Sequence, residues 1–382
     1  MDRSLLDPSN RDAAPHRQQA PGPSTMLAVV MHGFGDPDVL RVEQVPTPDA
    51  VPGEVVARIA AVEVSRTRDL GTRSGRHPFS RAVTLPHVLG GDCAGTVVAV
   101  GAGVHQALVG RRVGIMNHHT CGQCDACRAG RDDHCSALRM LGIHRWGSYA
   151  EYASVWVDSV HLIPDDLPFT EAAAMAATGP VAATQLVAAG VRADDHLLVT
   201  GLAGALASML AALADRLGVH VIGLTRRPDL VPTGSCSAVL DSSSPRLTDD
   251  ILAATGGDPP RAAIDNVCTP DVFDAYFPTL AHGARVVVSG AIAAPVMPVL
   301  SVPARDLYSR SIAVVGIRSH SVPATERFWR DVQEGFRLPP AQLNVEPFTR
   351  AADVHRAVAD LRTAGHTLLT LAGQLTPPGA VR

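Results

Sequence analysis

The chain contains no lysine, so all 33 of its basic residues are arginine and Schiff-base chemistry on a lysine side chain is excluded. Aromatic residues are scarce, at 4%, and only 18% of the 382 residues are charged. A formal net charge of -4 provides no broad basic surface for nucleic acid or an anionic membrane. No uninterrupted apolar run reaches membrane-spanning length, because the alanine-rich segment 172–189 is broken by Thr, Gly, Pro and Gln. We therefore expect a compact protein with a small-molecule partner.

The first 24 residues also lack something, namely the apolar core of an export signal. They are rich in Pro and Arg, so we expect a disordered tail over 1–24. Four of the seven cysteines are clustered, which suits a metal site in a reducing compartment better than the disulfide framework of a secreted protein. The expected location is the cytoplasm.

The remaining chain divides into regions of different pattern. Short runs with period-two alternation and β-branched residues, separated by Gly and Pro, predict a barrel-like β domain. Beyond Pro164, alternating helical and strand-like runs predict a parallel sheet with helices on both faces. The last region carries one strong helical pattern and a closing strand. We expect a β domain over 25–175, with a cysteine lobe at 117–140, a nucleotide domain over 176–318 and a return to the first domain over 319–382.

A glycine-rich turn follows the strand-like run that ends at Thr200. Gly201, Gly204 and Ala207 occupy the three small-residue positions of a dinucleotide loop. The first permits a tight turn, the second lets the backbone approach a pyrophosphate, and the third lets helix and strand pack closely. The helix start then offers free N–H groups to the phosphates. An Ala/Gly-rich junction without a ligand is the alternative. The residues expected to contact the cofactor here are Gly201, Ala203, Gly204, Ala205 and Leu206.

The tip of the next strand predicts which cofactor binds. It contains Thr225, Arg226 and Arg227, where an NAD site usually has an acidic residue. A carboxylate repels a 2′-phosphate, whereas guanidinium groups pair with it and a Thr hydroxyl donates to it. NADP(H) is therefore predicted. The alternative is a pair of solvated loop arginines.

The clustered cysteines are Cys121, Cys124, Cys127 and Cys135, spaced C-x2-C-x2-C-x7-C. Four thiolates from one short loop suit a closed tetrahedral zinc site, one per chain, that folds a lobe without a core of its own. An iron–sulfur cluster, or thiols without a metal, are the alternatives. The other cysteines, each isolated in apolar surroundings, are expected to be core thiols: Cys93, Cys236 and Cys268.

The order of cysteine lobe and glycine loop resembles the zinc-containing medium-chain dehydrogenase/reductase superfamily. The resemblance runs from about Met26 to Gln374 and includes the segments LPHVLGGDCAGTVVAVGAGV, GSYAEYASV and DLYSRSIAVVGI. It implies an α/β fold with a GroES-like β-barrel catalytic domain and a Rossmann domain with a doubly wound parallel sheet. It also implies a homodimer, with the segment IAVVGI as a plausible edge strand. Residues that the resemblance and strand ends place near the nicotinamide or its ribose are Thr178, Asn266, Val267, Gly290, Ala291 and Ile292.

The resemblance fails at the catalytic zinc. In zinc alcohol dehydrogenases of this superfamily, a Cys, a His and a second Cys hold this metal, and these fall at Ser65, Gly91 and Thr178. Glycine has no donor atom, and neutral hydroxyls are poor zinc ligands. We therefore expect a reaction centre without metal, with Ser65, Thr67 and Asp92 as candidate catalytic residues. Further candidate proton donors, each equally typical of a structural imidazole, are His118, His119 and His144.

Without a Lewis acid, a substrate with its own electron sink is favoured. The sequence therefore predicts NADPH-dependent reduction of an activated double bond, in an enone, an enoyl compound or a quinone, where charge spreads to an enolate. One alternative is an imine or iminium reductase in which Asp92 pairs with the cation. Another is a protein that binds NADP(H) without turnover. A third is a zinc-dependent alcohol dehydrogenase with unrecognised ligands.

Overall fold

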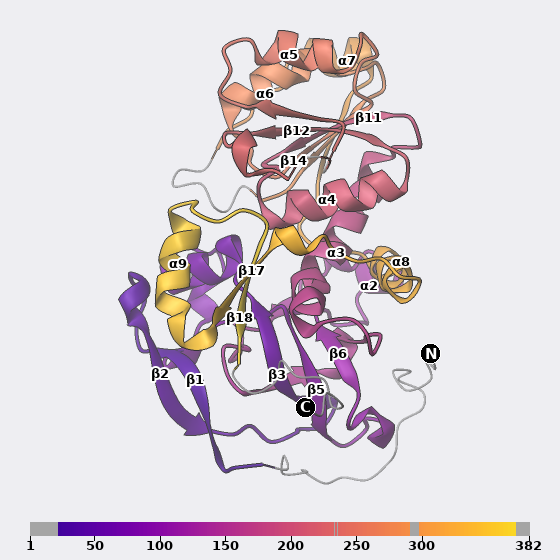
Figure 1. Cartoon of the computed structure of the whole chain (residues 1–382). Helices are drawn as coiled ribbons and strands as arrows, with labels where there is room; N and C mark the ends of the chain where they lie inside the picture. Colours follow the sequence, from indigo (N-terminus) through magenta and orange to yellow (C-terminus); the bar gives the residue numbers. More distant parts are fainter. Residues whose placement is uncertain (1–21, 233, 235, 291–297, 372–382) are drawn as a thin grey trace.

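The structure, a computed structural model, describes residues 22–232, 234, 236–290 and 298–371. Figure 1 shows a β-rich domain below and a sheet covered by helices above, with the long helix α3 (Phe169–Ala189) at their junction. The expected boundary between residues 175 and 176 falls inside α3. Composition marks where the sequence changes from strand to helix, but this helix packs on β3 and β5 of the lower domain and on β14 and β15 of the upper one.

The lower, catalytic domain is built on a seven-stranded sheet in the order β10-β6-β5-β3-β18-β17, with β9 also paired to β3. In β3 (Glu54–Glu63) nine of the ten residues are buried, because other elements cover both of its faces. The last two strands of the chain return to this sheet, as expected. The other strands are β5 (Cys93–Val100), β6 (Arg112–Ile115), β9 (Tyr152–Trp156), β10 (Val160–Leu162), β17 (Leu343–Pro347) and β18 (His366–Thr370).

Smaller elements complete the catalytic domain. A three-stranded sheet has the order β2-β1-β4, and β7 and β8 form a ribbon beside the cysteine lobe. Figure 1 shows α9 beside β1 and β2, and α8 on the opposite side of the domain near α2. Their bounds are β1 (Thr25–Met31), β2 (Leu40–Pro46), β4 (His87–Val88), β7 (His118–His119), β8 (Arg139–Met140), α1 (Gly71–Arg73), α2 (Asp125–Arg128), α8 (Val322–Gln333) and α9 (Ala351–Ala359).

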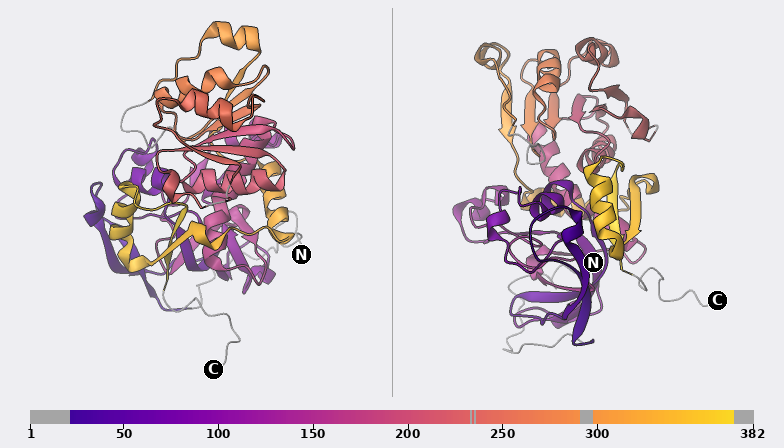
Figure 2. Two further views of the ribbon diagram at one scale, coloured as in Figure 1. Left: turned by 45° about the horizontal axis from the view of Figure 1, so that its top comes forward. Right: turned by 90° about the vertical axis from the view of Figure 1, so that its left-hand side faces the viewer.

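The upper, nucleotide domain has a six-stranded parallel sheet in the order β13-β12-β11-β14-β15-β16. Successive residues of β11 face opposite sides: Leu197 and Val199 pack with α3 and α4, and Leu198 packs with α5 and α6. The strand expected at a dimer edge, β16, lies at the edge of this sheet (Figure 2). The elements are β11 (His196–Thr200), β12 (His220–Thr225), β13 (Ala238–Asp241), β14 (Ala262–Asp265), β15 (Arg285–Val288), β16 (Ala313–Gly316), α4 (Ala205–Arg216), α5 (Leu247–Ala254), α6 (Pro270–Tyr276) and α7 (Ala304–Arg310).

Helix α3 is long and apolar enough to cross a membrane by length and composition alone. However, 72% of its most apolar stretch is buried inside the protein, as in the core helix of a two-domain fold. Gly190 caps its C-terminal end, with a left-handed backbone (φ 68°) that suits a residue without a side chain.

Candidate functional site

The glycine loop lies between the end of β11 and the start of α4, as the sequence predicted. Gly201 has φ 71°, and a Cβ there would lie 2.8 Å from the Val267 side chain. Gly204 is the residue that precedes α4, and Ala207 is buried in its first turn. The loop therefore leaves its backbone and the start of α4 open to a phosphate, because no side chain fills either glycine position.

A buried carboxylate, Asp265 at the end of β14, fixes the floor of this loop. It is fully buried and accepts hydrogen bonds from the Thr200 hydroxyl at 2.7 Å and the Tyr276 hydroxyl at 3.0 Å. The backbone N–H groups of Val267 and Cys268 donate to the same carboxylate, at 3.1 and 2.8 Å. Asp265 is not among the residues predicted from the sequence, although an acidic residue at the end of a buried strand is a detectable signal.

The strand ends expected at the nicotinamide lie together. The Gln185 side-chain amide donates to Asn266 Oδ1 at 2.9 Å, and a Cβ on Gly290 would lie 2.7 Å from Asn266 O. Val267 follows directly and is exposed. Thr178 is on α3, where its hydroxyl donates to Ala174 O. The expected residues Ala291 and Ile292 lie outside the described residues.

Three arginines converge beside the loop. Thr225 accepts a hydrogen bond from Arg227 N at 3.2 Å, and Arg227 Nη2 donates to Thr363 O, also at 3.2 Å. Arg66, which sequence analysis missed, belongs to the catalytic domain and keeps access to solvent. The surrounding protein and the positive charges of Arg226 and Arg227 lower the pKa of Arg66. None of the three arginines forms an ion pair with a described residue, so their charges are available to an anion such as a nucleotide phosphate.

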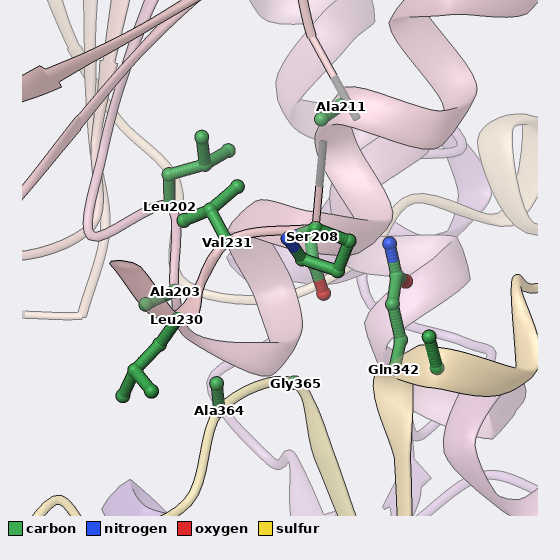
Figure 3. Close-up of a pocket in the computed structure, with 11 residues that line it drawn as sticks. Leu202, Ala203, Ser208, Ala211, Leu230, Val231, Gln342, Ala364 and Gly365 are labelled. Atoms are coloured by element: carbon green, nitrogen blue, oxygen red, sulfur yellow. The ribbon is translucent and has the colours of Figure 1, made fainter. Parts of the chain in front are cut away.

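A small pocket behind the loop lies between the two domains (Figure 3). Gly365, in the turn before β18, donates its N–H to Ala203 O at 2.9 Å. Gly365 has φ 66°, and a Cβ there would lie 2.4 Å from Gln342 O. The lining contains no ionisable side chain. The pocket is therefore part of the contact between the domains and not a reaction centre. It consists of Leu202, Ala203, Ser208, Ala211, Leu230, Val231, Pro232, Ala341, Gln342, Ala364 and Gly365.

The candidate catalytic hydroxyls follow β3 in a π-helical turn (Arg66–Leu70). The hydroxyl oxygens of Ser65 and Thr67 are 3.3 Å apart, and Ser65 Oγ accepts from Arg68 N at 3.2 Å. Both side chains are only partly buried. The turn therefore presents two neighbouring hydroxyl groups close to solvent.

Arg68, in the same turn, is buried and fully paired. Its Nε and Nη2 donate to the two oxygens of Asp69, at 2.9 and 3.0 Å, and its Nη1 donates to Asp92 Oδ2. The other oxygen of Asp92 accepts from Asn117 N at 3.1 Å. Burial raises the pKa of Asp92, and the Arg68 charge offsets this in part. Asp92 is 4% exposed with both oxygens engaged, so in this structure it holds Arg68 in place.

Arg68 also fills the space beside Gly91. A Cβ at Gly91 would lie 2.4 Å from Asn117 Cβ and 2.9 Å from Arg68 Cζ and Nη1. The family's catalytic zinc needs a histidine at this position, but the volume for one is taken. Ser65 and Thr178, at the other two positions, offer neutral hydroxyls, which are poor zinc ligands compared with thiolate or imidazole.

Gly91→His is therefore expected to destabilise the protein without recruiting a second zinc. Inserting a side chain into filled space costs about 1–3 kcal/mol, and a clash with another Cβ places this site at the upper end. Thermal unfolding and zinc analysis measure both effects. Gly33→His is the control, since a Cβ at Gly33 meets nothing within 4 Å. A second zinc in Gly91→His would show that Arg68 leaves room for a metal.

The three candidate histidines differ in their surroundings. His119 stacks on Trp156, with ring centroids 4.7 Å apart, and pairs with Asp158 at 2.8 Å. His144 accepts a hydrogen bond from Met140 N at 3.0 Å. His118 has a buried Nδ1 without a partner, and burial followed by the charges of His320, Arg68 and Arg318 takes its pKa well below the usual range. Of the three, His118 is the one that lies near the Arg68 charge.

The cysteine lobe brings its four thiols together. All four sulfurs lie within 4.8 Å of one another, with pairs at 3.5, 3.6 and 3.9 Å. Tetrahedral zinc with Zn–S bonds of about 2.3 Å requires S···S separations of about 3.8 Å, so the site fits zinc. Backbone N–H groups of Gln123 and Cys124 lower the pKa of Cys121 to about 6, which favours the thiolate that binds metal. Among the described residues this is the one group of three or more potential ligands, and Cys93, Cys236 and Cys268 are not part of it.

Comparisons with known proteins agree with this architecture. Residues 51–165 match the alcohol dehydrogenase GroES-like domain, and residues 205–334 match the zinc-binding dehydrogenase domain. An alcohol dehydrogenase of Rhizobium meliloti is 32% identical over 61% of this chain and 68% of its own length. An L-threonine 3-dehydrogenase of Saccharopolyspora erythraea is 31% identical over 64% of this chain and 71% of its own.

Solved structures give the same result for the whole fold. The structure of an NAD-dependent alcohol dehydrogenase superposes with a TM-score of 0.80 and 29% identity, over 91% of this chain and 100% of that one. The expected GroES-like and Rossmann domains are thus confirmed. The chain belongs to the medium-chain, zinc-type alcohol dehydrogenase family and is an NAD(P)-dependent oxidoreductase.

Proposed function

We propose that the chain is an NADP(H)-dependent oxidoreductase that interconverts an alcohol and a carbonyl compound without a metal ion at its reaction centre. The observation that carries the proposal is the buried Arg68–Asp92 pair, which fills the place of a zinc ligand beside Gly91 while the glycine loop keeps its open backbone. The alcohol–carbonyl pair is supported by the relatives, which are named alcohol, L-threonine and sorbitol dehydrogenases. NADP(H) is supported by Arg226 and Arg227, neither of which forms an ion pair with a described residue.

When bound, a nicotinamide cofactor supplies or accepts the hydride at the carbon that carries the oxygen. The protein has to stabilise the charge that develops on this oxygen. Ser65 and Thr67 present neighbouring hydroxyls, 3.3 Å apart, and are proposed to donate hydrogen bonds to it. Thr67 is proposed to pass a proton to it during reduction and to take one up from solvent, to which its side chain has access, while Arg68 and Asp69 hold the turn in shape.

Reduction of an activated double bond is the second candidate, favoured by the same lack of zinc ligands. In such substrates the charge spreads to an enolate, which hydroxyl donors stabilise more easily than an isolated alkoxide. The names of the relatives do not support it. Asp92 does not offer an iminium substrate a free carboxylate oxygen, because one oxygen of Asp92 accepts a hydrogen bond from Arg68 and the other accepts one from Asn117 N.

The test measures zinc per chain and turnover on the same purified protein. We expect about one zinc, NADP⁺ reduction with secondary alcohols and NADPH oxidation with ketones or aldehydes. About two zincs per chain, or activity lost to a chelator without unfolding, would mean that a metal acts at the reaction centre. Turnover confined to enones or quinones would select the second candidate, and tight NADPH binding without turnover would indicate a binding protein.

Ser65→Ala combined with Thr67→Val is expected to lower kcat on the same substrates by about 10²-fold, since removal of one donor to a developing oxyanion costs about that much. Ser74→Ala is the matched control: its hydroxyl lies in the same segment but donates to Gly71 O. Equal kcat in the double variant and the control would remove the two hydroxyls from the mechanism.

A further inference from the structure

Arg73 is a buried cation that forms no ion pair with any residue the structure describes. It ends α1, is 5% exposed, and has a buried Nε and a buried Nη1 that form no hydrogen bond. No carboxylate of the described chain lies within ion-pair distance of it. Burial lowers the pKa of Arg73, and the charge of Asp36 offsets this in part. A guanidinium cannot escape burial by losing its proton, so the charge remains.

Arg68, in the same segment, is a buried arginine whose N–H groups have hydrogen-bond partners. Three of its nitrogens reach two carboxylates, and Nη2 also reaches Glu63 O. An isolated buried charge costs several kcal/mol, and partners recover this only when they engage its N–H groups. Arg73 lies five residues later with none of these contacts.

The surroundings of Arg73 come from three elements. Gly35, in the loop after β1, donates its N–H to Arg73 O at 2.9 Å, and Asp36 follows it. Helix α9 brings His355 and Arg356 close enough for their charges to interact with Arg73. Arg356 is already paired with Asp38 and Asp353, whereas Arg76 donates to Ser74 Oγ and pairs with no acidic residue in the described part of the chain. Asp36 is therefore the acidic residue that acts on the charge of Arg73, and it lies beyond ion-pair distance, while Asp38 and Asp353 are engaged by Arg356.

The same region holds neutral polar atoms without partners. Thr72 Oγ1 and Ser80 Oγ, on either side of Arg73 in the chain, are buried and form no hydrogen bond. His355 Nδ1 is buried and unpartnered as well. Its Nε2 is 3.1 Å from the Tyr149 hydroxyl, which itself donates to Asp69. Hydroxyl and guanidinium donors of this kind are the groups that bind oxyanions in proteins.

We propose that Arg73 anchors a binding site for a small oxyanion, a phosphate or a carboxylate group, between α1, the loop 32–39 and α9. The planar fork of a guanidinium matches two oxygens of either group, and a bound anion supplies the counter-charge that the fold lacks. The site is separate from the cofactor phosphates, which meet Arg66, Arg226 and Arg227 at the glycine loop.

The test compares the Tm of the wild type and Arg73→Met at constant ionic strength while sodium phosphate, or in a second series sodium acetate, replaces sodium chloride. In chloride alone Arg73→Met is expected to unfold at the higher temperature, because it removes a buried unpaired charge. With phosphate or acetate the wild-type Tm is expected to rise by roughly 2–4 °C more than that of Arg73→Met. A response to one salt alone identifies the anion.

Two controls separate this site from other effects. Arg81→Met removes a nearby exposed arginine and is expected to respond like the wild type. Arg73→Lys keeps the charge without the fork and is expected to retain a reduced response. Phosphate at the cofactor arginines raises the Tm equally in all variants, so it cancels in the comparison. An identical response in wild type and Arg73→Met, or a lower Tm of Arg73→Met in chloride, would overturn the proposal, the latter by showing that Asp36 already serves as partner.

Discussion

Cys127→Ser is expected to reduce the zinc content from about one per chain to nearly none and to lower the Tm by about 10 °C or more. Zinc held by four thiolates contributes about 10–16 kcal/mol of binding free energy in small domains, and that energy is folding energy. The lobe has little else to hold it, because α2 has no buried residue and spans only four residues. At roughly 2–4 °C per kcal/mol for a domain of about 150–250 residues, a few kcal/mol of lost stability gives a change of this order.

The loss of structure in Cys127→Ser is expected to extend beyond the cysteine lobe. Arg318 Nη2 donates to Cys135 O at 2.6 Å, and Asp132 accepts from Val322 N, the first residue of α8, at 3.3 Å. An unfolded lobe therefore releases the start of α8 as well. Cys236→Ser, outside the lobe, is the control and should keep both zinc and Tm. Zinc analysis and calorimetry decide the matter: full zinc in Cys127→Ser would contradict the assignment, and iron in place of zinc would indicate a cluster.

The second large expected effect is on the affinity for the cofactor. Arg226→Ala combined with Arg227→Ala should weaken NADPH binding by roughly 10²-fold or more, because each hydrogen bond to a charged group contributes about 1.5–3 kcal/mol. NADH binding should change by less than about threefold, since its ribose carries no phosphate. Fluorescence titration of both nucleotides gives the ratio of Kd values.

The neighbouring acid Asp241 does not oppose this expectation. It pairs with Thr225 in the sheet, but its carboxylate accepts from Ser243 N at 2.9 Å and Ser243 Oγ at 2.6 Å. Arg330→Ala, a surface arginine on α8, is the control. Equal loss of NADPH and NADH binding in the double variant would show that the two arginines support the loop and do not recognise the 2′-phosphate.

Most of the fold could be predicted because its signals are local. The alternation of small and β-branched residues, the glycine loop and the cysteine spacing all lie within about fifteen residues of sequence. Each of these patterns has a physical cause that acts over the same short distance, such as a tight turn at Gly201 or four sulfurs around one ion. The predicted boundary at 175/176 lies within α3, because the change from strand-like to helical composition marks the start of a helix that contacts both domains.

The reaction centre was harder to predict than the fold, because its main contacts join residues that are far apart in the sequence. The sequence shows that Gly91 lacks a ligand atom. It does not show that Arg68, 23 positions earlier, fills the space beside Gly91. Nor could it place Arg66 next to Arg226, which belongs to the other domain. Such contacts depend on how β3, α3 and the nucleotide domain pack, and no short pattern encodes that packing.

The hydrogen bond between Gly365 and Ala203 has a kinetic consequence. It joins the glycine loop to the turn before β18, and Arg227 joins the nearby Thr363 to the tip of β12, where the cofactor ribose is predicted to bind. Both bonds use backbone carbonyls, so ordinary side-chain substitutions at 203 and 363 leave the acceptors in place. The two bonds therefore hold the glycine loop and the tip of β12 to one turn of the catalytic domain. We expect a bulky residue at 365 to weaken this double link, because its Cβ would lie 2.4 Å from Gln342 O, and so to speed nucleotide exchange.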